Sequence, residues 1–303
     1  MQHGRYRFVV GFLVVPIVLY AVFVLSPFVQ AFYYSLTNWT GVSPQFDFVG
    51  LQNFERLAND SVFLRAIRNN AVLLVVVPVV TIVLALLYAF LLNVGGRAGA
   101  AGVRGVRGAD FYKLVFFMPQ VLSVPVIAVI WSVILTPTGD GLANSLLGAL
   151  GVDPKGWLAD PSMALWCVVW VLVWGGVGFY LVLFNAAMSS IPRDIFEAAL
   201  IDGAGRVTTF VRITIPLLWD TIQTAWVYIA ILALDVYALV AVMTVGPGGP
   251  DNATQVMSLQ IASNGFQYGQ AGYASAMGVV LFLTTLVIAV VMLRATRREQ
   301  IEY

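Results

Sequence analysis

The chain has 303 residues, of which 60% are hydrophobic and 10% are charged, and its formal net charge is +1. This balance lies far from that of soluble domains and indicates an integral membrane protein, and the small net charge gives no basic surface for nucleic acid. The single cysteine, Cys167, and the single histidine, His3, exclude an internal disulfide, a cysteine metal cluster and histidine-based catalysis.

Six apolar stretches are long enough to cross a bilayer, whose core of about 30 Å needs about 20 helical residues. The predicted spans are 8–30, 71–93, 114–135, 164–187, 219–243 and 273–293. Backbone groups in lipid must be hydrogen-bonded within the protein, and runs of this length favour helices over barrel strands. The sequence therefore predicts an all-α integral membrane protein with one transmembrane domain over 1–303 and six transmembrane helices.

Lysine and arginine residues in the loops predict which side of the membrane each loop occupies. With the N-terminus inside, twelve of these residues fall on the cytoplasmic side and four on the other side. We therefore expect both termini and the loop at 190–216 in the cytoplasm. The glycine-rich connector at 95–108 is also cytoplasmic, and it lacks the strand–turn–helix setting of a phosphate-binding loop.

An island of mixed charge separates the fourth and fifth predicted spans. Ser190 is a candidate cap and Pro192 a candidate first-turn residue, so a helix is expected to begin there, with Asp194 adding favourable charge. Gly203 is expected to end this helix, and Glu197 is expected to project from its apolar face. That predicted face consists of Ile195, Ala198, Ala199 and Ile201.

A second helical pattern follows, and Pro216 is expected to stop it. Its predicted face consists of Val207, Phe210, Val211 and Thr214. The product is a helix–turn–helix against the cytoplasmic membrane surface, in which Phe210 offers an anchor for a pocket. Small residues that would let another backbone approach are Ala198, Ala199, Gly203 and Ala204. Periodicity alone favours the alternative, an interfacial helix that only packs beneath the bundle.

The spacing of this island resembles the EAA signature of ABC importer permeases. The match consists of Glu197-Ala198-Ala199, Gly203, Ile213 and Ile215-Pro216. FVGLQNF at 48–54 and SIPRDIFEAALIDGAG at 190–205 are similar to motifs of the sugar-importer branch, the maltose and glycerol-phosphate type permeases. Two features depart from that branch: the Gly-Pro loop at 246–250 is two residues longer, and Asp220 stands where many relatives have proline.

The resemblance implies the permease fold of a type I ABC importer in a bacterial inner membrane. It implies a related second permease chain, two copies of a cytoplasmic ATPase that holds ATP and magnesium, and an extracytoplasmic sugar-binding protein. This chain would then bind no cofactor and catalyse no reaction. The island would be a coupling helix seated in a groove of the ATPase. Its coupling residues would be Glu197, Ala198, Ala199, Asp202, Gly203, Ala204, Phe210 and Pro216.

Asp235 is the only acid or base well within a predicted span, and Tyr237 lies close to it. A charge at the helix centre costs about 2.5–3.5 kcal/mol on insertion scales, so this group should face the bundle or a watery cavity. Asp235 either accepts sugar hydroxyls along the route or bonds to a Ser, Thr or Trp of another helix. Further candidates by residue type, each of which more often serves packing, are Trp131, Trp174, Tyr180, Asn185, Gln223 and Tyr228.

Three glycines, Gly175, Gly176 and Gly178, interrupt the fourth predicted span. Close helix packing is their simpler interpretation, and a hinge for alternating access is the other.

Two other classes of function stay open. A secondary transporter or channel for a small polar solute would work alone. Such a protein is expected to show internal repeats, matched broken helices or a chain of titratable residues within its spans. An intramembrane enzyme would need clustered carboxylates or a nucleophile beside a base, and the sequence offers neither near the membrane.

Overall fold

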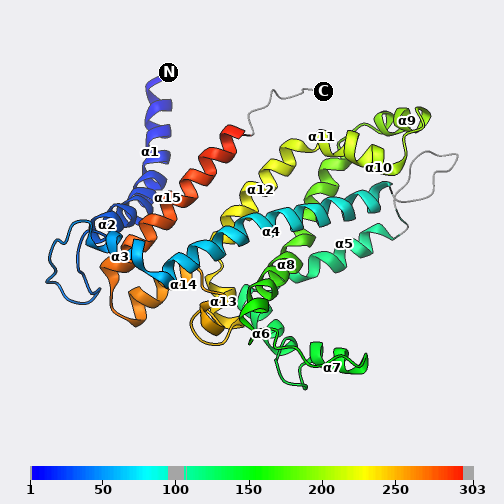
Figure 1. The fold of residues 1–303 in the computed structure, drawn as a ribbon. Helices are drawn as coiled ribbons and strands as arrows, with labels where there is room; N and C mark the ends of the chain where they lie inside the picture. Colours follow the sequence, from blue (N-terminus) through cyan, green and yellow to red (C-terminus); the bar gives the residue numbers. More distant parts are fainter. Residues whose placement is uncertain (1, 95–105, 107, 296–303) are drawn as a thin grey trace. The chain divides into compact units, whose positions relative to one another are not determined.

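A computed structural model of the chain describes residues 2–94, 106 and 108–295 (Figure 1). The described part of the chain is helical apart from its connections and one isolated bridge, which confirms the predicted all-α fold. The predicted connector at 95–108 lies mostly outside the described residues. The chain forms two compact units. Unit 1 consists of 1–64 and 260–287, and unit 2 consists of 65–259 and 288–303.

Four helices in the described part of the chain are long and apolar enough to cross a membrane, and six spans result if each of two bent helix pairs counts as one. The four are Gly11–Tyr34, Ser61–Asn93, Pro161–Ser189 and Ala271–Val291. The bent pairs are Ala109–Val121 with Val124–Ile134, and Arg206–Leu217 with Trp219–Leu234. In chain order, these elements overlap the six predicted stretches.

Unit 1 pairs the first and last long helices. Its elements are α1 (Gln2–Tyr20), the π-helical η1 (Ala21–Leu25), α2 (Ser26–Tyr34), α3 (Gln52–Asn59), the start of α4, the end of α14 (Met257–Ala262), the π-helical η5 (Ser263–Gln267) and most of α15 (Ala271–Ala295). Phe282 of α15 packs against two rings of α2, with centroid distances of 5.2 Å to Phe28 and 6.0 Å to Phe32.

The FVGLQNF motif holds the turn that follows α2. The amide of Asn53 donates to the carbonyls of Ser35 at 2.9 Å and Thr37 at 2.8 Å. Asp60 then caps α4 by accepting backbone N–H groups, and it also accepts the Tyr273 hydroxyl of α15 at 2.7 Å. Within unit 1, Asn53 of the motif therefore fixes the turn after α2, and Asp60, beyond the motif, links the start of α4 to α15.

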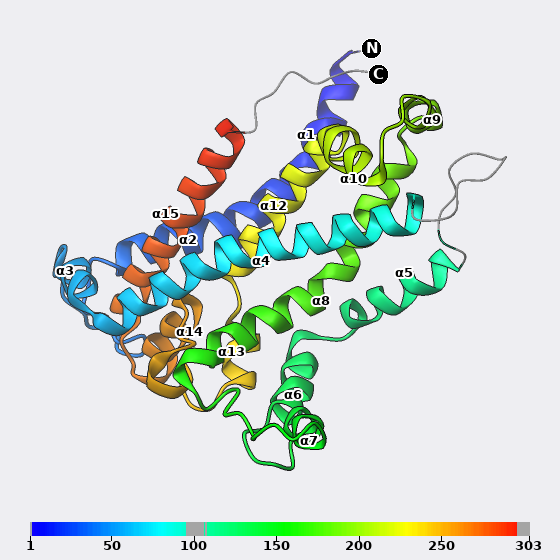
Figure 2. The same cartoon turned by 45° about the vertical axis from the view of Figure 1, so that its right-hand side comes forward.

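Unit 2 contains the remaining spans. Its elements are most of α4 (Ser61–Val94), α5 (Ala109–Phe117), η2 (Met118–Val121), α6 (Val124–Ile134), α7 (Leu142–Ala149), α8 (Pro161–Ser189), α9 (Arg193–Ile201), α10 (Arg206–Thr209), η3 (Phe210–Thr214), α11 (Ile215–Leu217), α12 (Trp219–Leu234), α13 (Tyr237–Met243), η4 (Pro250–Asn252) and the start of α14 (Met257–Ala262). α9 and α7 lie at opposite ends of α8 (Figures 1 and 2).

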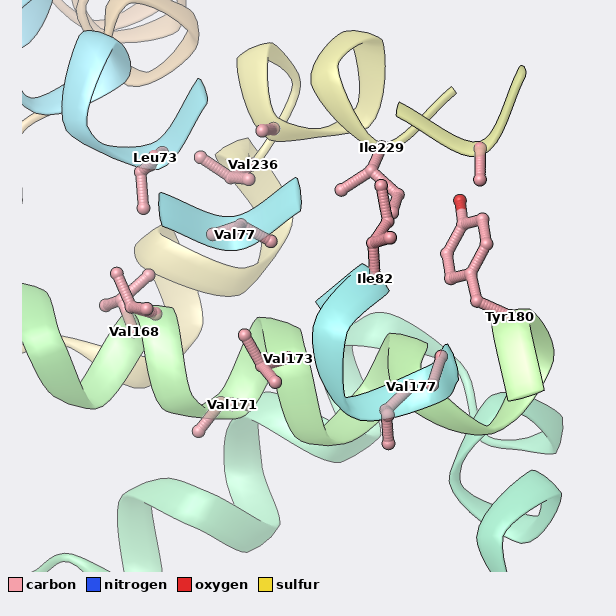
Figure 3. Close-up of a cluster of buried hydrophobic side chains, with 14 of the residues drawn as sticks. Leu73, Val77, Ile82, Val168, Val171, Val173, Val177, Tyr180, Ile229 and Val236 are labelled. Carbon is pink, nitrogen blue, oxygen red and sulfur yellow. The ribbon is translucent and has the colours of Figure 1, made fainter. Parts of the chain in front are cut away.

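The core of unit 2 lies between α4, α8 and α12 (Figure 3). β-branched and leucine side chains fill it, and many of them are less than 5% exposed. The labelled members are Leu73, Val77, Ile82, Val168, Val171, Val173, Val177, Tyr180, Ile229 and Val236. Since lipid tails are as apolar as these side chains, close van der Waals packing holds such helices together.

One glycine of the fourth span makes the closest of these approaches. A methyl group at Gly178 would collide with the backbone carbonyl of Phe116 at the end of α5, whereas one at Gly175 would have ordinary contact with Ile127 at 3.9 Å. α8 runs without a break from Pro161 to Ser189. The close-packing interpretation therefore holds at Gly178, and α8 is unbroken at these glycines.

The third predicted span, 114–135, is two helices in the structure rather than one. The pair bends by 99° between Val121 and Val124. Pro119 lies in the 3₁₀ turn η2 and Pro125 in the first turn of α6, so backbone N–H groups are missing on both sides of the bend.

The connection from α6 to α8 is organised around one buried amide. The side chain of Asn144 donates to the carbonyls of Thr136 and Lys155 and accepts the indole N–H of Trp157 at 2.9 Å. At the end of this connection, Asp160 caps α8 and accepts the backbone N–H of Ser162 at 2.8 Å. The hydroxyl of Ser162 donates to the same carboxylate. Together the two bonds hold the pKa of the Asp160 carboxyl below its usual value.

Candidate functional site

The island at 190–216, which the sequence predicts to be cytoplasmic, folds into a short helix followed by a turn. α9 begins at Arg193, directly after Pro192, and Asp194 lies in its first turn, where a negative charge is favourable. The predicted capping role of Ser190 is wrong. Ser190 is the C-cap of α8 instead, and its hydroxyl donates to the carbonyl of Ala187 at 2.8 Å.

The end of α9 explains the Glu-Ala-Ala and glycine spacing. The N–H of Ala204 donates to the carbonyl of Ala199 at 2.9 Å, and the N–H of Gly203 donates to the carbonyl of Leu200 at 3.1 Å. This bond pair is the Schellman motif, which requires a left-handed residue that is usually glycine. Gly203 has φ of +75°, so the predicted helix end is correct.

The turn divides the island into a covered face and an open face. Ala199 is 6% exposed, whereas the side chains of Glu197, Ala198 and Asp202 are exposed. Several apolar side chains are exposed beside them: Leu200, Ile201, Val207 and Val211. The predicted apolar face of α9 is therefore split, since Ala199 points inward and Ile201 points outward.

The second arm of the island packs on α4 through one ring. Phe210 is half-buried, and its ring centroid lies 4.7 Å from that of Phe90. Thr214, one turn further on, is fully buried, and its hydroxyl donates to the carbonyl of Thr209 at 3.2 Å. Phe210 and Thr214 thus join the island to the bundle, and the other two members of the predicted face point outward.

The predicted stop at Pro216 is wrong. Helical backbone continues through α11 to Leu217, because Pro216 lies in the first turn of α11, directly after the π-helical turn η3. The chain then bends by 73° at Leu218 and enters α12. Asp220 is exposed in the first turn of α12, where its charge favours the helix start.

Asp235 lies at a break in the fifth predicted span. α12 ends at Leu234 and α13 begins at Tyr237. The side chains of Asp235 and Tyr237 are exposed, and no hydrogen bond to the Asp235 carboxylate exists within the described part of the chain. The helix–helix bond considered as its structural role is therefore not formed there.

The other candidates by residue type lie in different settings. Trp131 and Trp174 pack edge to face with centroids 5.3 Å apart, and Asn185 accepts the amide of Asn93 at 2.7 Å. Tyr228 is 64% exposed. A cavity of about 490 Å³ between α4, α5 and α8 is lined mainly by aliphatic and aromatic side chains, so it offers few hydrogen bonds to a sugar.

No group of three or more His, Cys, Asp or Glu side chains in the described ranges is placed to hold a metal ion.

Comparison with known proteins assigns the family. Residues 57–299 match the family described as binding-protein-dependent transport system inner membrane component. The chain is 43% identical over 300 residues to the diacetylchitobiose uptake system permease protein NgcF of Streptomyces coelicolor, covering 98% of this chain and 84% of that protein. It is 32% identical to the multiple sugar-binding transport system permease protein MsmF of Streptococcus mutans, covering 96% and 95%.

A solved structure shows the same fold. In a bacterial alginate ABC transporter, crystallised in complex with an alginate pentasaccharide-bound periplasmic protein, one chain superposes with a TM-score of 0.81 at 22% identity, covering 98% of this chain and 96% of that one. The expected permease fold is therefore confirmed, and the family is a transport component rather than an enzyme. The chain belongs to the family of binding-protein-dependent transport system inner membrane components.

Proposed function

We propose that this chain is a transmembrane permease subunit of an ATP-driven, binding-protein-dependent sugar importer, forming half of the translocation pathway. The observation that carries the proposal is α9, an exposed helix ended by a left-handed glycine turn and joined to α4 through Phe210. Such an element can receive a partner on its open face and pass a displacement to the bundle. As proposed here, residues 1–303 make one permease domain, and 190–216 is its coupling loop.

The sugar class is supported by the relatives. Three of them are named for diacetylchitobiose uptake, multiple sugar-binding transport and lactose transport. Diacetylchitobiose is the first sugar to test, because the permease named for it shares the highest identity of the three.

The proposed partners are a related second permease, two copies of a cytoplasmic ABC ATPase and an extracytoplasmic sugar-binding protein. ATP and magnesium belong to the ATPase, and this chain holds no cofactor. The loop and both termini are assigned to the cytoplasm, since twelve lysine and arginine residues lie on that side and four on the other.

Each residue of the coupling loop has a distinct proposed task. Glu197, Ala198 and Asp202 lie on the open face and would contact the ATPase groove. Three residues form the turn that shapes this face: Ala199, Gly203 and Ala204. Phe210 would transmit a displacement to α4, and Pro216 would begin the rigid segment that leads into α12.

The proposed transport cycle needs two states of the bundle. Closure of the ATPases around ATP would move α9 and, through the second arm, α4 and α12, and hydrolysis would reset them. Asp235 and Tyr237 would line the route, where exposed oxygen atoms can exchange hydrogen bonds with sugar hydroxyls.

Cross-linking from the open face of α9 tests the proposal. Ala198→Cys in a Cys167→Ser background would be labelled with a benzophenone maleimide in native membranes and photolysed, and the products identified by mass. We expect an ABC ATPase as the product. The matched control, Leu146→Cys on exposed α7, should not yield it, because α7 lies at the other end of α8. A lipid adduct alone at residue 198 would support the interfacial-helix alternative instead.

A further inference from the structure

The chain breaks between α12 and α13, within the fifth predicted span 219–243, without a residue that breaks helices. Asp235 has φ of −109° and ψ of 63°, and Val236 has φ of −101° and ψ of 17°. The sequence from 230 to 240 is AILALDVYALV, which contains neither glycine nor proline. Since kinks in helices come from such residues or from groups that insert into the hydrogen-bond ladder, the cause lies in a neighbouring element.

A buried asparagine of α4 occupies the place of the missing ladder bond. In a continuous helix the carbonyl of Ala233 would accept the N–H of Tyr237, four residues on. Here the side-chain amide of Asn70 donates to that carbonyl at 3.4 Å. Asn70 is only 2% exposed, so water does not replace this bond.

The same amide also caps a second helix. The side-chain oxygen of Asn70 accepts the N–H of Met257 at 2.8 Å, and Met257 is the first residue of α14. The first N–H groups of a helix and its last carbonyls have no partners within the helix. One buried side chain therefore supplies a partner to the end of α12 and to the start of α14.

The preceding residue has a different task. Asn69 is 6% exposed, and its amide donates to the carbonyls of Ala253 at 3.0 Å and Gln255 at 2.9 Å. These contacts hold the loop between α13 and α14 but do not reach the break. A variant at Asn69 therefore loses contacts to the loop and keeps the Asn70 bond at the break. Comparing variants at the two positions separates the two contributions.

The far end of α4 meets the coupling loop. Phe90 packs on Phe210, and Asn93 is fixed to Asn185 of α8 at 2.7 Å. α4 is one helix from Ser61 to Val94 with Pro78 inside it, so both contacts and Asn70 belong to the same helix. If a displacement of the coupling loop moves α4, it also moves the Asn70 amide, which holds the break.

We propose that Asn70 is a positioning residue for transport. It keeps the fifth span broken after Leu234, so that the Asp235 carboxylate stays exposed on the route, and it links this break to the helix that the coupling loop contacts. This inference rests on the proposed function of the chain. Without the amide, the Tyr237 N–H can bond to the Ala233 carbonyl, and the span closes into a continuous helix that turns residue 235 away.

Thiol accessibility tests the geometric part without knowledge of the sugar. Asp235→Cys in a Cys167→Ser background, within the complete transporter in nanodiscs, is labelled with a charged methanethiosulfonate. Adding Asn70→Leu, which has similar size but no hydrogen-bonding group, should lower the labelling rate about tenfold, the equivalent of one buried hydrogen bond. Asn69→Leu should change the rate by no more than about twofold.

Two further variants keep the result decisive. Asn70→Gln retains the amide and should restore most of the labelling, and Asn70→Ala is measured if the leucine variant does not assemble. Equal labelling of residue 235 with asparagine and with leucine or alanine at position 70, in transporters that assemble equally, would overturn the inference.

Transport kinetics separate this inference from the function on which it rests. With Asp235 present, Asn70→Leu should raise the KM for diacetylchitobiose-loaded binding protein or uncouple ATP hydrolysis from uptake, while Asn69→Leu keeps the two coupled. In one outcome, the wild type takes up sugar with ATP while both variants couple hydrolysis to uptake just as the wild type does. That result would refute the role of Asn70 and leave the proposed function standing. Failure of the wild type to take up any of a panel of diacetylchitobiose, lactose and maltose would refute the proposed function.

Discussion

At the residue scale, Gly203 is the position where backbone conformation decides the shape of the proposed coupling loop. Its φ of +75° lies in the left-handed region, and a methyl group added there meets no atom within 4 Å. A substitution therefore acts through backbone strain and leaves packing intact. Gly205 also has open space around it, but its φ is −69°, so it provides a matched control.

We predict that Gly203→Ala reduces ATP-dependent uptake in vesicles, because strain of about 1–2 kcal/mol favours another turn and tilts the open face of α9. Gly205→Ala should transport normally, since any residue adopts its conformation. Uptake rates measured at equal membrane levels decide the matter. Equal rates for the two variants would show that the turn does not need the left-handed conformation.

Asp235 is the residue on which the pathway assignment depends. We predict that Asp235→Asn alters the KM or the choice of sugar without loss of assembly, because an amide presents a donor where the carboxylate only accepts. Asp220→Asn, an exposed acid in the first turn of α12, is the control and should leave both unchanged. Wild-type kinetics in the Asp235 variant would remove this residue from the route.

The sequence predicted some of these residues and missed others, for physical reasons. Gly203 was found because a helix end that needs a left-handed residue has a strong local signature. Asn69 and Asn70 were missed, because a buried asparagine in an apolar helix gains its role from carbonyls more than 160 residues away in the chain. The break at Asp235 was missed for the same reason, since its cause is not in its own segment.

At the element scale, the packing of α8 on α5 depends on one missing side chain. We predict that Gly178→Ala lowers stability by about 1–3 kcal/mol or prevents assembly, because the added methyl group forces the Phe116 backbone away. Gly175→Ala, three residues earlier in the same helix, should be tolerated. Thermal unfolding of the two variants in detergent checks this, and equal midpoints would contradict the close approach.

The second arm of the coupling loop is tied to α4 mainly by Phe210. We predict that Phe210→Ala leaves the ATPase bound but lowers uptake per ATP hydrolysed, since the arm loses its contact with Phe90. Val211→Ala removes a neighbouring side chain that is 52% exposed and should transport normally. Loss of bound ATPase in the Phe210 variant, with the ratio of uptake to hydrolysis unchanged, would place this ring at the ATPase interface instead.

The accuracy of the sequence predictions differed between elements. The helical character of the apolar stretches followed from length and hydropathy, since lipid leaves few alternatives for the backbone. The bends did not follow, because Pro119 and Pro125 leave the direction and size of a bend open. The predicted stop at Pro216 failed because proline is tolerated in a first turn, and the π-helical turn before it supplies a new helix start.

At the scale of the whole molecule, the chain has features of one component of a larger machine. The first long span, Gly11–Tyr34, has none of its most apolar window buried within the chain, and Ser61–Asn93 has 39% buried. Such apolar surface suits contact with lipid or with other chains. In unit 2, α4 contacts the proposed coupling loop through Phe90 near one end. Near its other end, α4 contacts the break after Leu234 through Asn70.

The central claim is that this chain transmits motion and performs no energy-yielding chemistry. Uptake of radiolabelled diacetylchitobiose into proteoliposomes tests it most directly, with the purified chain alone compared with the complete transporter, binding protein and ATP. We predict accumulation against a gradient only in the complete system, and none when ATP is omitted. Accumulation of the sugar against its gradient by the purified chain alone would contradict the account.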